Sequence, residues 1–142
     1  MISEPKKRPA GVTALSVFFT AGSIVCLIAS LSLALPNNFL EPMWRLNPHG
    51  REGLATVGRW AILLLSTVGV FCAAAAVGLW RGHRWGYRIA VALIAINLAG
   101  DIINTLLGTE PRAIVGVPIA LAILLYLASK RVRLFFHKAM AD

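Results

Sequence analysis

Four long apolar runs alternate with short polar segments along the chain. They cover residues 10–40, 60–80, 89–109 and 113–129, and Asp101 is the single charged residue inside them. About 20 apolar residues in a helix are enough to cross the ~30 Å hydrocarbon core of a bilayer. The runs are continuous, unlike the alternating strands of a membrane β-barrel. The pattern predicts an all-α, polytopic membrane protein with spans at about 11–35, 57–80, 87–107 and 111–129.

The spans leave little chain for a second domain. The 142 residues are therefore expected to form a single transmembrane domain, 1–142, built as an antiparallel four-helix bundle. In the outer loop, 36–56, residues 39–46 predict a short interfacial helix with Trp44 at the level of the lipid headgroups. Residues 47–50 predict a turn. The basic cytoplasmic tail, 130–142, is expected to extend the last helix along the inner surface.

Positive charge is gathered on one side of the spans. The bases of that side are Lys6, Lys7, Arg8, Arg81, Arg84, Arg88, Lys130, Arg131, Arg133 and Lys138. Since Lys and Arg are retained in the cytoplasm during insertion, both termini are expected there, in a bacterial cytoplasmic (inner) membrane. Orientation explains the net charge of +8, so no nucleic-acid partner is expected, whereas contact with the anionic headgroups of the bilayer is.

The first apolar run has an alternative interpretation as a cleaved signal peptide. Three bases precede it, and residues 32–34 form a small-x-small site. Signal sequences carry about 7–15 apolar residues, and the 25 residues from 11 to 35 suit a span better. Cleavage would leave three spans and an external N-terminus.

Polar side chains gather at one place in the third run. Asn97 lies four residues before Asp101 and Asn104 three after, so the three share a helical face, which Thr105 flanks. An Asp at the centre of a span costs about 2.5–3.5 kcal/mol to insert. We call these four residues the polar stripe. The polar stripe is therefore expected to face the interior of the bundle.

Three interpretations of the polar stripe stay open. In the structural one, Asp101 pairs with Arg112 or Arg59 near the outer ends of neighbouring helices. In the second, Asp101 exchanges protons or binds a cation. In the third, the stripe lines a small polar pocket with the carbonyl group freed by a helix kink at Pro118.

The second run carries a row of small residues at spacings of three and four. These residues are Ser66, Gly69, Ala73 and Ala76. Small side chains allow two helix backbones to approach closely, which is how helices associate in lipid. The row predicts a helix-packing face, with a partner either in this chain or in a second copy.

The sequence offers no set of residues for a reaction. Cys26 and Cys72 fall within spans and predict apolar packing, with a crosslink between them as the alternative. The three histidines lie in predicted loops or tails, so neither a haem, nor a metal site, nor any other cofactor is expected. Small four-helix multidrug exporters depend on an acid in the first span, and this chain has none there. We therefore expect no enzymatic activity.

Four short segments resemble a known group of proteins. They are GLWRGHRWG at 78–86, GDIIN at 100–104, PR at 111–112 and GVPI at 116–119. Residues 78–129 are, through these segments, similar to small uncharacterised bacterial integral membrane proteins with four helices. The resemblance implies a four-helix protein of the inner membrane and supplies no activity.

Two functions are consistent with these features. The first is a non-enzymatic accessory or scaffold subunit that binds another membrane protein through its small-residue face. The second is a small transporter or channel, working as a homo-oligomer, in which Asp101 couples to protons or cations.

Overall fold

The computed structural model describes residues 8–35, 37, 39–108 and 113–138, and every regular element in these ranges is a helix. The elements are α1 (Ala10–Ala34), the short 3-10 helix η1 (Glu41–Leu46), α2 (Pro48–Val57), α3 (Arg59–Trp80), α4 (Arg84–Leu107), α5 (Ala113–Ala128) and α6 (Lys130–Lys138). The predicted all-α class is confirmed.

Three of these helices are long and apolar enough to cross a membrane. They are α1 with 25 residues, α3 with 22 and α4 with 24. A fourth candidate is the pair α5 and α6, which pass the same test together but meet at an angle of 53° around Ser129. The described part of the chain therefore has three such helices, or four if the bent pair forms one span.

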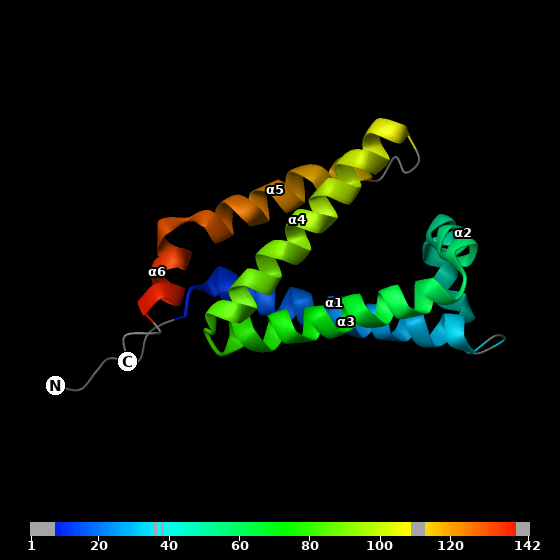
Figure 1. Cartoon of the computed structure of the whole chain (residues 1–142), viewed down its shortest axis with the longest axis horizontal. Helices are drawn as coiled ribbons and strands as arrows, with labels where there is room; N and C mark the ends of the chain where they lie inside the picture. The colour runs from blue at the N-terminus through cyan, green and yellow to red at the C-terminus, as the bar shows by residue number, and fades with distance from the viewer. Residues whose placement is uncertain (1–7, 36, 38, 109–112, 139–142) are drawn as a thin grey trace. The chain divides into compact units, whose positions relative to one another are not determined.

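The chain divides into two compact units. The first comprises Met1–Val17 and Ala74–Asp142, and the second comprises Phe18–Ala73. Helices α1 and α3 each contribute to both units. In the first unit, α5 runs antiparallel to α4 along most of its length, and α6 turns from the end of α5 to contact α4 (Figure 1). The second unit holds the rest of α1 and α3, together with η1 and α2.

A glycine turn in the first unit ends α3 and begins α4. Gly82 has a φ of +73°, in the left-handed region where glycine carries no steric penalty. Its N–H donates to the carbonyl of Leu79 (3.2 Å), and the N–H of His83 donates to that of Gly78 (2.8 Å), the bond pair of a Schellman motif. A Cβ on Gly78 would lie 3.0 Å from the backbone nitrogen of Gly86, so both positions require glycine for this close approach.

The segment between α1 and α3, in the second unit, contains more helix than the predicted loop, because α2 follows η1. Residues 47–50 do not form the predicted turn, because Asn47 caps α2: its side-chain oxygen accepts from the N–H of Gly50 at 2.9 Å, and Pro48 occupies the first helical position. Gly58, with a φ of +63°, separates α2 from α3.

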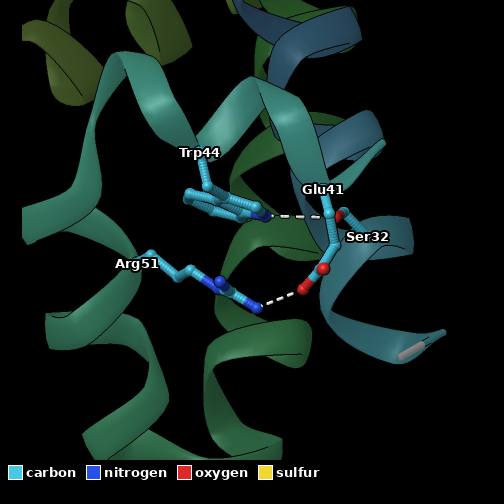
Figure 2. A network of polar contacts seen from close by, with 4 residues as sticks. All are labelled: Ser32, Glu41, Trp44 and Arg51. Carbon is cyan, nitrogen blue, oxygen red and sulfur yellow. Dashed lines mark hydrogen bonds and ion pairs between the residues drawn. The ribbon is translucent and has the colours of Figure 1, made fainter. Parts of the chain in front are cut away.

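Trp44 lies in η1, and its side chain is buried rather than facing outward. Only 8% of the residue is exposed, and the indole N–H donates to the hydroxyl of Ser32 in α1 at 3.0 Å (Figure 2). A tryptophan becomes buried most readily where its N–H finds an acceptor, which Ser32 supplies here. Beside it, Arg51 of α2 pairs with Glu41 of η1. These contacts hold η1 and α2 against the end of α1.

The region around Pro118 is helical throughout. Helix α5 runs from Ala113 to Ala128 with Pro118 inside it, and the 53° bend of this region falls at Ser129, between α5 and α6. Beyond the bend, the tail is helical over Lys130–Lys138, with Val132 and Phe136 buried and Lys130, Arg131 and Arg133 exposed. It is the amphipathic helix that the alternation of bases and apolar residues in the tail predicts.

Candidate functional site

The polar stripe lies in the C-terminal half of α4, where two hydrogen bonds organise it. The side-chain amide of Asn97 donates to a carboxylate oxygen of Asp101 at 3.0 Å. The hydroxyl of Thr105 donates to the backbone carbonyl of Asp101 at 2.7 Å. Both bonds span four residues of one helix, so the stripe is organised first by α4 itself. Asp101 and Thr105 are half-buried, whereas Asn97 and Asn104 are exposed.

The Asp101 carboxylate rests on the backbone of α5 at Gly116. A Cβ placed on Gly116 would lie 2.9 Å from the carboxylate carbon and closer still to one of its oxygens. A side chain at Gly116 would require the Asp101 carboxylate to move. The Asp101 carboxylate therefore lies between α4 and α5, whereas the side chain of Asn97 is exposed. The predicted interior position of the polar stripe stays a prediction.

The sequence predicts Arg112 or Arg59 as the ion-pair partner of Asp101. Arg112 falls outside the described residues. Arg59 begins α3 in the second unit, with an exposed side chain. Pro118 follows Gly116 by two residues in α5, so the proline and the Asp101 contact belong to the same turn of that helix. An ion pair of Asp101 stays a prediction.

The small-residue face of α3 contacts α1 of the same chain. In the second unit, a Cβ on Gly69 would meet Cys26 and Leu27 at 3.2–3.3 Å, and the hydroxyls of Ser66 and Ser30 lie 2.7 Å apart. Ala73 is half-buried in that unit. In the first unit, Ala76 is 5% exposed. Gly69 marks the closest approach because it has no side chain.

A row of serines on α1 forms the other side of these contacts, and sequence analysis missed it. Ser16 donates to the carbonyl of Ala76 (2.8 Å) in the first unit. Ser23 donates to that of Gly69 (2.9 Å) and Ser30 to that of Ile62 (3.2 Å) in the second. We call these three residues the serine stripe. Their spacing of seven residues, two helical turns, was the available signal.

The two thiols belong to the second unit. Cys26 is half-buried and Cys72 is buried, and both are free cysteines. Among the described residues, no three His, Cys, Asp or Glu side chains are grouped so that they could hold a metal ion.

Both units have cavities at charged ends of their helices. In the second unit, a cavity of about 820 Å³ opens between η1 and α2, and its charged walls are Glu41, Arg45, Arg51 and Glu52. Its acids and bases balance, and one pair is already joined as Arg51–Glu41. In the first unit, a smaller cavity of about 390 Å³ lies between α4, α5 and α6, and its charged walls are all basic.

Comparison of the chain with protein-family models, with curated protein sequences and with solved structures finds no match in any of the three.

Proposed function

We propose that the chain is a small multi-pass protein of the bacterial cytoplasmic membrane, and that it serves as a non-enzymatic accessory or scaffold subunit. The fold supports insertion: α1, α3 and α4 have the length and apolarity of spans, and the bent pair of α5 and α6 would complete an antiparallel four-helix bundle. The relation to small bacterial four-helix membrane proteins, which residues 78–129 resemble, belongs to the same proposal.

The distribution of charge supports an orientation with both termini in the cytoplasm. The turn between α3 and α4 carries Arg81, α4 begins with Arg84, and α6 carries Arg131 and Arg133, all in the first unit. Arg8, just before α1, stacks on the ring of Trp80 at 4.4 Å. A base paired with an aromatic side chain at a helix end is typical of the membrane interface.

The open side of the polar stripe carries the proposal of an accessory subunit. In α4, 11% of the most apolar stretch is buried, against 33% in α1 and in α3. Asn97 is exposed there, and Asp101 is half-buried. An amide that faces hydrocarbon loses the hydrogen bonds that water would supply, at a cost of roughly 1–3 kcal/mol on protein scales. Covering this face with another polypeptide removes that cost.

The test is the mass of the particle extracted from the membrane. The full-length chain, tagged and expressed at low level, is extracted in a mild detergent, and the polypeptides in the particle are weighed and identified. We expect at least one polypeptide in addition to the 15.3 kDa chain. Asn97→Leu should release it, whereas Ile103→Ala, an exposed position on another face of α4, should not. A stable monomer without a companion would contradict the proposal.

A second candidate, an oligomeric transporter or channel, is favoured by the position of Asp101. Its carboxylate lies between α4 and α5, against Gly116. If the extracted particle contains only copies of this chain, proton or cation flux is measured in liposomes. If the unaltered protein conducts protons or cations and Asp101→Asn abolishes that flux, the transporter hypothesis would replace the scaffold hypothesis. Absence of flux in the unaltered protein would remove the transporter.

A further inference from the structure

The basic cavity of the first unit has the features of an anion site. Its volume is about 390 Å³. We call it the basic pocket and define it by Arg84, Tyr87, Arg88, Arg133, Phe136 and His137. Two of the arginines come from the first turns of α4, and the third comes from α6. The basic pocket is thus assembled by segments about 50 residues apart in the sequence.

Aromatic packing holds the walls of the basic pocket together. The hydroxyl of Tyr87 donates to the carbonyl of Leu127 at 3.0 Å, which joins α4 to the last turn of α5. The rings of Tyr87 and Phe136 pack with centroids 5.2 Å apart, and Phe136 is 2% exposed. The bend at Ser129 then places α6 across the start of α4. The charged groups therefore project from a packed base.

The charges of the basic pocket are of one sign. Three guanidinium groups and an imidazole line it, and its described walls contain no carboxylate. A guanidinium N–H of Arg84 donates to Nδ1 of His137. The positive charges of the basic pocket are those of Arg84, Arg88 and Arg133, and a negative charge between them is attracted to all three. The wall residues therefore favour an anionic occupant.

The surroundings of the basic pocket suit an amphipathic ligand. A smaller basic cavity beside it shares Arg133 and His137 and adds Lys130 and Leu134. Leu134 is 57% exposed, and Trp85, next to Arg84, is 46% exposed. Exposed apolar and aromatic side chains beside bases are typical of the interface between headgroups and acyl chains. Such a setting fits a lipid better than a small ion from solution.

We propose that the basic pocket binds the phosphate group of an anionic phospholipid of the cytoplasmic leaflet. Arginine forks match phosphate oxygens in pairs, which gives a held geometry rather than a diffuse attraction. Basic pockets between membrane helices on the cytoplasmic side bind phospholipid headgroups in this way. The inference rests on the proposed membrane insertion and adds to it a defined lipid site.

The test measures lipid retention by the full-length protein in a neutral detergent. Native mass spectrometry records the binding of phosphatidylglycerol and of phosphatidylcholine. We expect phosphatidylglycerol to bind about tenfold more tightly, because its headgroup carries a net negative charge, whereas the choline cation of phosphatidylcholine offsets the charge of its phosphate. Arg133→Gln and Arg88→Gln should each remove most of this preference. Arg133→Lys, which keeps the charge but loses the fork, should remove part of it.

Arg131→Gln is the matched control. Arg131 lies on α6, is exposed like Arg133, and is not part of the basic pocket. It should alter the preference less than twofold. An equal loss with Arg131→Gln and Arg133→Gln would overturn the site in favour of diffuse attraction to negative charge. Unchanged binding in both Arg133→Gln and Arg88→Gln would overturn it as well. The melting temperature of each variant establishes that it is folded.

Two further arms separate this inference from the function on which it rests. In the first, inorganic phosphate is added to the protein with bound phosphatidylglycerol. Displacement of the lipid at millimolar phosphate would assign the basic pocket to a soluble anion and overturn the proposal of a lipid site. Release of the unaltered protein from membranes by an alkaline carbonate wash would overturn membrane insertion itself. Retention in the washed membrane without a preference for phosphatidylglycerol would overturn the lipid site alone.

Discussion

The contacts between α1 and α3 and those between α4 and α5 place polar groups within apolar helices in two different ways. The serine stripe donates across to main-chain carbonyls of the neighbouring helix. In α4, Asn97 and Thr105 bond back to Asp101 of their own helix. The serine donors between helices are buried, whereas the bonds within α4 leave Asn97 exposed and Asp101 and Thr105 half-buried. The first arrangement stabilises a pair of helices, and the second leaves the Asn97 amide accessible.

A substitution at the closest approach of α1 and α3 should have the largest effect. Gly69→Leu forces a side chain against Cys26 and Leu27, where a Cβ alone would already be at 3.2–3.3 Å. We expect the free energy of unfolding to fall by about 2–3 kcal/mol, as in overpacked cores. Titration with dodecyl sulfate, followed by tryptophan fluorescence, measures it.

Gly22→Leu is the control for that substitution. Gly22 lies in α1, and a Cβ there would meet nothing within 4 Å. It carries the same change in helix propensity, so the difference between the two variants isolates the steric cost. Equal stability of Gly69→Leu and Gly22→Leu would show that α1 and α3 do not pack through this face.

Removal of the serine stripe should have the next largest effect. Replacing Ser16, Ser23 and Ser30 by alanine removes four hydrogen bonds between helices, three to main-chain carbonyls and one between the hydroxyls of Ser30 and Ser66. Such bonds average about 0.6 kcal/mol each in membrane proteins, so the triple variant should lose about 2 kcal/mol in the same titration. Thr105→Val, whose lost bond lies within α4, should change stability by less than about 0.5 kcal/mol. If Thr105→Val lowered the free energy of unfolding more than the triple serine variant does, the hydrogen bonds between α1 and α3 would not be the more stabilising ones.

The contact between α4 and α5 should show a smaller effect, visible as a coupling. Gly116→Ala places a methyl group where the Asp101 carboxylate lies. In a double-mutant cycle with Asp101→Ala, we expect a coupling free energy of roughly 1 kcal/mol, since removing the acid makes room for the methyl group. Gly100→Ala, where a Cβ would meet nothing within 4 Å, should show none with Asp101→Ala. Additive effects at Gly116 and Asp101 would mean that the two residues do not touch.

The helices were predictable from the sequence because their signals are local. Uncharged runs predict the helices, and glycines with positive φ, Gly82 and Gly108, stand where α3 and α4 end. The start of α2 was not predictable in the same way. Asn followed by Pro favours both turns and helix N-termini, and the bond from Gly50 to Asn47 decides between them.

The candidate site was predictable in its residues but not in its contacts. The spacing of Asn97 and Asp101 places them on one face of a helix, and they are hydrogen-bonded there. That Gly116 faces Asp101 depends on the register of α5 against α4, which no local pattern encodes. The serine stripe was overlooked for a related reason. The sequence does not show which main-chain carbonyl a serine in an apolar helix will bond, because that depends on the neighbouring helix.

The seven-residue spacing of the serine stripe restricts sliding of one helix along the other. Ser23 and Ser30 in α1 match Gly69 and Ile62 in α3, which are also seven residues apart. A displacement by one or two residues would take both hydroxyls away from the carbonyls they now bond, and equivalent carbonyls on the same face of α3 return only after one helical turn, about 5.4 Å. Small piston-like shifts of α1 along α3 therefore cost both hydrogen bonds.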